Sequence, residues 1–279
     1  VPTDGSDSAD SALAAALAVA DAHDARLHLL YVADTNQPSL TNVQGSVRDV
    51  LEQRGDEVLD DAERRARNAG VETVSEVVQG GPSRTIRTYV DDRGVDLVVM
   101  GTRGERDVDE MVLGSVTDRV LRDSPVPVVT VAPETTTEYP PEAVLVGTDG
   151  SDTATAAVAE AAAVAAATGA ELHLLAVDEA DLLGLDLSSD DERADRLADR
   201  LDDAAERARE RGADDVVTAV EEGAVDEAVA EYVADNGVDL VVLGASGRGG
   251  LDRRVLGSTT QRVVRSSDVP VLTVPPTGE

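Results

Sequence analysis

The sequence repeats itself, and this repeat constrains the possible folds more than any other feature. VPTDGSD at residues 1–7 matches VGTDGSD at 146–152, and LHLLYV at 27–32 matches LHLLAV at 172–177. GVDLVVMG at 94–101 matches GVDLVVLG at 237–244, and VPVVTV at 126–131 matches VPVLTV at 269–274. The copies are offset by 145 residues early and 143 late. Two domains with the same order of elements are therefore expected in the 279 residues.

The join between the copies predicts the domain boundaries. Residues 133–141 are rich in Thr and Pro and suit neither a helix nor a central strand, so we expect domains at 1–133 and 142–279. The second copy begins its first strand at Ala143, whereas the first copy begins at Val1, which matches Val146. Domain 1 is therefore expected to lack most of a central strand, either because its start is lost or because the first repeat is degenerate.

Apolar runs alternate with segments of helical length in each half. Helices are expected at 9–22, 56–68 and 84–92, and at 154–167, 194–211 and 226–235, with Gly94 and Gly237 ending the last of each set. The Val/Leu runs are continuous rather than alternating, which is typical of parallel strands buried on both faces. The sequence thus predicts two doubly wound α/β domains with helices on both faces of each sheet.

Composition excludes several chemistries. All 24 basic residues are arginine, and the chain has no Lys, Cys, Phe or Trp. Schiff bases, a Walker A lysine, disulfides and thiolate nucleophiles are therefore ruled out. Three histidines leave little for a metal site, and no metal is expected. The matched His28 and His173 are expected to be packed or partly exposed strand residues rather than ligands. We expect no catalytic residues, because no nucleophile–base–orienter group is apparent.

The net charge of −32 bears on partners and on solvent. It argues against nucleic acid and anionic membranes, because phosphate binding needs clustered cations. No apolar run approaches ~20 residues and no signal peptide is apparent, so a soluble, cytoplasmic protein is expected. The acidic, lysine-free composition resembles that of proteins from salt-loving microbes. Self-repulsion should weaken folding in dilute buffer, and molar salt should screen it.

Two repeated motifs lie where ligands bind in parallel α/β sheets, beyond the carboxyl ends of the strands. Thr-Asp-Gly-Ser at 3–6 and 148–151 offers a carboxylate to a ribose or base amine, or forms only a helix cap. Gly-x2-Gly-x9-Gly-Ser at 101–115 and 244–258 allows positive φ and close approach of a ligand, and then opens a helix whose free N–H groups favour an anion. A phosphate held by backbone amides is expected, and the alternative is a purely structural turn, since turns after strands are often rich in glycine. An adenine would rest on aliphatic side chains near Val32 and Val177.

This layout resembles that of tandem universal stress proteins, whose nucleotide-binding members carry the same spaced glycine motif and a strand-one Asp. The resemblance covers nearly the whole chain. It implies five parallel strands per domain, bound ATP (or ADP or AMP, with or without Mg²⁺), and an intramolecular pseudo-dimer through 126–131 and 269–274. It leaves a further homodimer open. Asp4 and Asp149 would contact the nucleoside, and Val32 and Val177 the adenine through their backbones.

The ribose and phosphates would be bound by the glycine motifs, at Gly101, Gly104, Gly114, Ser115 and Val116, and at Gly244, Gly247, Gly257, Ser258 and Thr259. The remaining predicted nucleotide-binding residues are Thr3, Arg103, Thr148, Ser246 and Arg248.

The two glycine motifs differ in charge. Residues 101–115 hold two arginines against four acidic residues, whereas 244–258 hold three arginines against one aspartate. Tighter nucleotide binding is therefore expected in the second half, unless these charges only face solvent. The predicted function is nucleotide binding in stress response or regulation, without metabolic catalysis, although slow ATP hydrolysis stays open. The alternative is an adaptor module of the same fold that binds no nucleotide and works through protein contacts.

Overall fold

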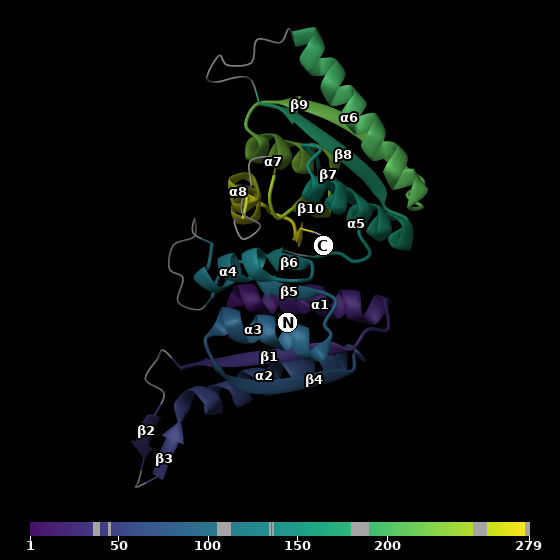
Figure 1. Ribbon diagram of the computed structural model, residues 1–279. Helices are drawn as coiled ribbons and strands as arrows, with labels where there is room; N and C mark the ends of the chain where they lie inside the picture. The colour runs from purple at the N-terminus through teal and green to yellow at the C-terminus, as the bar shows by residue number, and fades with distance from the viewer. Residues whose placement is uncertain are drawn as a thin grey trace. The chain divides into compact units, whose positions relative to one another are not determined.

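The computed structural model describes residues 1–35, 40–43, 46–104, 113–133, 135, 137–179, 190–247 and 256–276. The chain forms two compact units, Val1–Tyr139 and Pro140–Glu279. Each is an α/β unit (Figure 1), as the sequence predicts. No helix in these described ranges is both long and apolar enough to cross a membrane.

Unit 2 forms a five-stranded parallel sheet in the order β11-β10-β7-β8-β9. Its fully buried central strands, such as β7 with Val144, Leu145 and Val146 at 0% exposure, explain the continuous apolar runs in the sequence. α5 and α6 pack against each other and against the sheet, and α7 packs with α8 (Figure 1). The elements are β7 (Ala143–Gly147), α5 (Asp152–Thr168), β8 (Glu171–Asp178), α6 (Asp190–Glu210), β9 (Val216–Glu222), α7 (Val225–Asn236), β10 (Leu240–Gly244), α8 (Ser258–Ser266) and β11 (Val271–Val274).

Unit 1 has two pairs of parallel strands, β1 with β4 and β5 with β6. Where β7 pairs with β8 in unit 2, the segment Val1–Thr3 lies along β1: Thr3 N–H donates to Leu30 O at 2.9 Å, and Leu30 N–H donates to Val1 O at 3.0 Å. The elements are α1 (Asp7–Ala22), β1 (Leu27–Asp34), α2 (Val50–Asn68), β4 (Thr73–Gly80), α3 (Pro82–Arg93), β5 (Val98–Gly101), α4 (Ser115–Asp123) and β6 (Val128–Val131).

An antiparallel hairpin, β2 (Leu40–Val43) with β3 (Ser46–Asp49), precedes α2 and was not expected from the sequence. The sequence analysis also did not predict the edge strands β4 and β9. In both, most residues are half-buried or exposed, so neither presents the continuous apolar run that identified the other strands.

Helices cover both faces of the β1–β4 pair in unit 1. Successive residues of a strand point to opposite faces. The Tyr31 ring packs over Gly55 of α2, whereas His28, three residues earlier, contacts Tyr89 of α3. α2 and α3 therefore lie on opposite faces of β1.

The two predicted helix ends are confirmed, since Gly94 and Gly237 are left-handed C-caps with φ of 61° and 62°.

Candidate functional site

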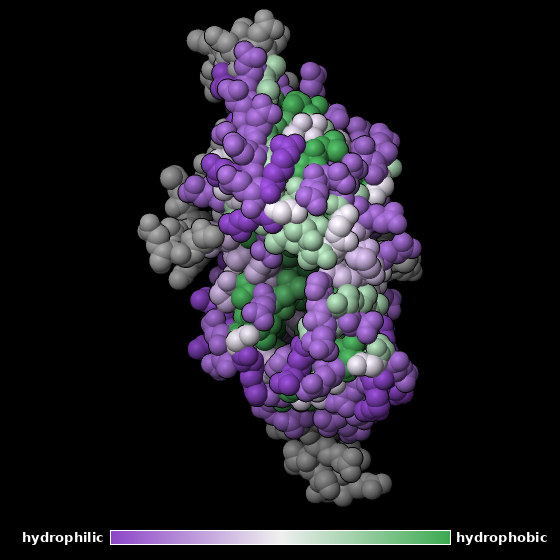
Figure 2. Space-filling view, turned by 90° about the vertical axis from the view of Figure 1, so that its right-hand side faces the viewer, coloured by the Kyte–Doolittle hydropathy of each residue, from purple (hydrophilic) through white to green (hydrophobic). Residues whose placement is uncertain are grey.

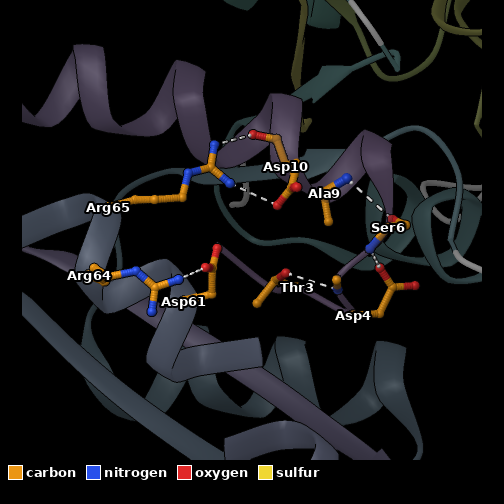
Figure 3. A network of polar contacts seen from close by, with 9 residues as sticks. Thr3, Asp4, Ser6, Ala9, Asp10, Asp61, Arg64 and Arg65 are labelled. Carbon is orange, nitrogen blue, oxygen red and sulfur yellow. Dashed lines mark hydrogen bonds and ion pairs between the residues drawn. The ribbon is translucent and has the colours of Figure 1, made fainter. Parts of the chain in front are cut away.

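The Thr-Asp-Gly-Ser turn has the same hydrogen bonds in both units. Ser6 caps α1 by accepting from Ala9 N–H at 3.2 Å, and Asp4 Oδ1 accepts from Ser6 N–H at 3.1 Å (Figure 3). The matching distances in unit 2 are 3.2 Å from Ala154 N to Ser151 Oγ and 2.9 Å from Ser151 N to Asp149 Oδ1. The helix-cap interpretation is therefore confirmed. The bond from the serine N–H to Oδ1 also orients each aspartate side chain, and its other oxygen, Oδ2, is not used by that bond. The cap and a binding role are therefore compatible.

Hydrogen bonds join the two described ends of each glycine motif. Gly114 N–H donates to Thr102 O at 2.9 Å, and the Thr117 hydroxyl donates to Gly101 O at 2.9 Å. In unit 2, Gly257 N–H donates to Ala245 O at 2.8 Å and the Thr260 hydroxyl to Gly244 O at 2.8 Å. The start of each helix is thus held against the end of the strand before it.

The helices that follow these turns begin without a side-chain cap. Gly114 and Gly257 are the N-caps of α4 and α8, and neither offers a side-chain acceptor to the first-turn N–H groups. α1 and α5, by contrast, are capped by serines. Uncapped N–H groups at a helix N-terminus attract anions, so each glycine motif ends in the kind of backbone site expected for a phosphate.

The glycines at the two helix starts do not adopt the positive φ that glycine allows. Gly114 and Gly257 have φ of −56° and −60°. Gly101 and Gly244 are needed for a different reason: a Cβ on Gly101 would lie 2.7 Å from the Ser8 carbonyl carbon, and one on Gly244 would lie 2.8 Å from the Thr153 carbonyl carbon. These two glycines let the first helix of each unit approach the strand end, a packing role that sequence spacing alone did not reveal.

The two motifs meet in each unit, although nearly 100 residues separate them. In unit 1, Arg103 N–H donates to Ser8 Oγ at 3.3 Å, and that hydroxyl donates to Val131 O at 3.0 Å. In unit 2, the Thr153 hydroxyl donates to Ser246 O, and a Cβ on Gly247 would lie 2.9 Å from Asp149 Oδ2. In unit 2, the aspartate of the first motif therefore lies beside a glycine of the second.

A cavity of about 400 Å³ in unit 1 lies at this meeting point. All nine residues predicted for the first copy line it: Thr3, Asp4, Val32, Gly101, Arg103, Gly104, Gly114, Ser115 and Val116. These residues come from the ends of three strand-like segments and the start of α4. The cavity is therefore at the carboxyl edge of the strands, where the sequence analysis expected a ligand.

Other residues of this cavity were not predicted. Besides aliphatic side chains, it has an aromatic one, Tyr31, as well as the charged Asp34 and Arg54. Arg54 comes from α2, a helix that no motif connected to the site. The sequence contained a signal only for the hydroxyl groups that hold the two motifs together. Ser8 is matched by Thr153 and Thr117 by Thr260, at the two repeat offsets. The remaining lining residues are Pro2, Ala9, Leu30, Leu51, Pro82, Ile86, Met100 and Thr117.

The matching segments of unit 2 have the backbone hydrogen bonds described above, but their surroundings differ. Leu30 and Met100, which line the cavity of unit 1, correspond to Leu175 and Leu243. In unit 2, β7 pairs beside Leu175, and a Cβ on Gly147 would lie 3.0 Å from Leu243 Cδ2. The predicted residue Arg248 and most of the charged residues behind the predicted difference in affinity, at 105–112 and 248–255, lie outside the described residues.

The two strand histidines pack as the sequence predicts. His28 Nδ1 lies 3.0 Å from the Tyr89 hydroxyl, and His173 Nδ1 lies 2.9 Å from the Tyr232 hydroxyl. Burial lowers the pKa of His28 below its ordinary 6.5, and nearby positive charges lower it further. These histidines join a strand to a helix on the face away from α2 and α6. Among the described residues, no group of three or more His, Asp or Glu could hold a metal ion.

Known proteins share this architecture. A crystal structure of a universal stress protein from Archaeoglobus fulgidus has a TM-score of 0.76, with 24% identity, and the match covers 99% of this chain and 97% of that one. Universal stress protein MJ0531 of Methanocaldococcus jannaschii is 32% identical over 134 residues, 47% of this chain and 79% of that protein. YxiE of Bacillus subtilis, also a universal stress protein, is 33% identical over 141 residues, 47% of this chain and 95% of that protein.

The fold and the paired motifs thus define a tandem α/β protein of Rossmann-like class, with one copy of the same domain in each half. The universal stress protein family matches residues 1–132 and 141–275. The chain belongs to this family.

Proposed function

We propose that this universal stress protein binds an adenine nucleotide at the carboxyl edge of its strands and acts as a nucleotide-dependent regulator in stress response. The observation that carries the proposal is the unit 1 cavity, where the nine residues expected to contact a nucleotide line one space. Its volume of about 400 Å³ lies within the range usual for small-molecule sites, about 300–1,000 Å³.

The chemistry of the cavity suits the parts of a nucleotide. The uncapped N-terminus of α4 and the Ser115 hydroxyl offer donors to a phosphate, and Arg103 and Arg54 add positive charge. Carboxylates such as Asp4 accept hydrogen bonds from ribose hydroxyls or a base amine. Leu30, Val32 and Ile86 supply apolar surface for the base. This combination supports binding and orientation of a nucleotide; it provides no nucleophile with an adjacent base.

The matched segments of unit 2 are proposed to bind a second nucleotide, at Thr148, Asp149, Val177, Gly244, Ser246, Gly247, Arg248, Gly257, Ser258 and Thr259. The excess of arginine in residues 244–258 favours tighter binding there.

The strands β6 and β11 each pair on one side within their own unit, with β5 and β10. We propose that they pair with each other in antiparallel fashion, because an open edge strand invites aggregation. Separately expressed halves should then associate, and halves that stay monomeric would contradict the pairing.

The test is nucleotide identification followed by titration. Protein purified in high salt should release ATP, ADP or AMP on denaturation, detected by mass spectrometry. Stripped protein, with and without Mg²⁺, should bind about two equivalents by calorimetry. Gly114→Val should remove the unit 1 site and Gly257→Val the unit 2 site, each weakening that site ~tenfold or more by obstructing the phosphate.

A smaller substitution at the same position shows whether a side chain there disturbs folding. A Cβ on Gly257 would lie no nearer than 3.5 Å to any neighbour, so Gly257→Ala should keep the melting temperature of the parent protein. Unchanged affinity in both valine variants would contradict the backbone-phosphate mechanism. Absence of any nucleotide binding by folded protein would instead favour the adaptor alternative, and steady release of ADP from ATP would favour slow hydrolysis.

A further inference from the structure

A second cavity, of about 420 Å³, lies in unit 2 between α5 and α6. Thr148 is the only one of its described lining residues that also belongs to the proposed nucleotide site. Its lining is formed by Thr148, Gly150, Thr155, Val158, Arg196, Asp199, Arg200, Asp203, Ala204 and Arg207. This cavity is therefore built mainly from helix side chains and not from the glycine turns.

Three arginines on one side of α6 line this cavity. Arg196, Arg200 and Arg207 are spaced by four and seven residues, which places them along one helix face. Val158 and Ala204, which are 2% and 6% exposed, form an apolar, closely packed floor. The described lining thus holds three arginines against two aspartates, in a chain whose net charge is −32. The described lining therefore has a small positive excess in a strongly acidic chain.

The corresponding cavity in unit 1 is acidic instead. It has a volume of about 520 Å³, and its described lining holds Arg54 against three acidic residues, Asp10, Glu57 and Asp61. LDDA at 59–62 matches LDDA at 201–204, an offset of 142 residues that places Val58 where unit 2 has Arg200. At the offset of 145 residues, Asp10 stands where unit 2 has Thr155. The two cavities therefore have the same position in the fold but opposite charge.

Asp10 has a specific role in unit 1. Arg65 Nη1 donates to Asp10 Oδ1 at 2.8 Å, and Arg65 Nη2 donates to the Asp10 carbonyl oxygen at 3.2 Å (Figure 3). Arg207 is the counterpart of Arg65 on α6, but Thr155 offers it no carboxylate. Within the part of unit 2 that the structure describes, Arg207 makes no hydrogen bond or ion pair. Unit 2 thus keeps the arginine and lacks the anion that neutralises it in unit 1.

We propose that the cavity between α5 and α6 binds a phosphate group, either as free phosphate or as a small phosphate ester. Guanidinium groups present paired N–H donors that match phosphate oxygens, and the Thr155 hydroxyl adds a donor from the opposite helix. The phosphate would occupy the place that the Asp10 carboxylate takes beside Arg65 in unit 1. The space exceeds that of one phosphate ion, which leaves room for the organic part of an ester.

The experiment exchanges residues between the repeats. Inorganic phosphate and glycerol 3-phosphate are titrated into isotope-labelled full-length protein, at the lowest KCl concentration that keeps it folded. Amide NMR shifts of Thr155 and Ala204 report on this cavity, and those of Ser115 and Ser258 report on the nucleotide sites. Phosphate and glycerol 3-phosphate should both shift the amide signals of Thr155 and Ala204. Tighter binding of glycerol 3-phosphate than of phosphate would identify the ligand as a phosphorylated metabolite. Equal affinity for the two would identify it as free phosphate.

Thr155→Asp installs the carboxylate of unit 1 and should weaken phosphate binding at this cavity ~tenfold or more by pairing with Arg207. Thr155→Asn has nearly the same shape without the charge and should retain binding. Conversely, Asp10→Thr with Val58→Arg should create phosphate binding in unit 1. Equal affinity in the Asp and Asn variants, or shifts confined to Ser115 and Ser258, would overturn the proposal. Nucleotide affinity is read separately, so either proposal can fail without the other.

Discussion

At the scale of single residues, two glycines of the same motif serve different purposes. A Cβ on Gly244 would lie 2.8 Å from the carbonyl carbon of Thr153, because α5 begins directly against the end of β10. A Cβ on Gly257 would meet only ordinary contacts, at 3.5 Å or more. The first glycine is therefore required by packing, whereas packing within the unit does not require the second.

This difference predicts opposite results for one substitution at two positions. Gly244→Ala should lower the free energy of unfolding by about 1–3 kcal/mol, because backbone atoms of Thr153 must move. Gly257→Ala should leave it nearly unchanged. Chemical denaturation of both variants in the same buffer measures the difference. Equal stability of the two variants would show that α5 can shift without cost, contrary to the packing described here.

At the scale of elements, the two units pack the same strand–helix pair with exchanged side chains. In unit 1, Tyr31 of β1 packs over Gly55 of α2, where a Cβ would lie 2.6 Å from the tyrosine Cδ1. At the matching positions of β8 and α6, unit 2 has Ala176 and Leu197, both buried. A large strand residue with a small helix residue in one unit thus becomes a small strand residue with a large helix residue in the other.

A double-mutant cycle tests this exchange. Gly55→Leu alone should destabilise unit 1 by about 1–3 kcal/mol through overpacking, and Tyr31→Ala alone by about 3–5 kcal/mol through the cavity it leaves. The double variant carries the combination found in unit 2, so its loss of stability should be smaller than the sum of the single losses by about 0.5–3 kcal/mol. Strictly additive losses from denaturation curves would contradict the compensation.

At the scale of the whole molecule, charge repulsion should govern stability. Hydrophilic residues dominate the face seen in Figure 2, and the net charge is −32. Ion pairs such as Arg26–Glu72, with side chains 58% and 71% exposed, offset little of this repulsion. We therefore expect the fold to depend on dissolved salt to screen this repulsion.

We accordingly expect the melting temperature to rise steeply from dilute buffer to molar KCl. Sucrose at equal osmolality should raise it less, because sucrose does not screen charge. Asp60→Asn with Asp202→Asn removes one exposed charge from the second helix of each half and should reduce the salt dependence slightly. A melting temperature that is the same in dilute buffer and in molar KCl would refute the argument.

The sequence by itself determined the two-domain plan, the parallel strands and the residues that meet at the unit 1 cavity. These follow from local signals, namely apolar runs, helix stops and a glycine spacing that occurs twice, each of which acts within a few residues of chain. The repeat also indicated that the matched segments would meet at one sheet edge, since carboxyl ends of parallel strands share that edge.

Only the tertiary structure decided which side chains surround those segments. Arg54 enters the cavity from a helix that carries no motif, and Gly101 is fixed by its approach to Ser8, more than 90 residues away. The cavity of Arg207 differs in charge from its counterpart through the replacement of Asp10 by Thr155 on a neighbouring helix. Contacts of this kind depend on how distant elements pack, and packing is set by the shapes of all the side chains together rather than by any local pattern.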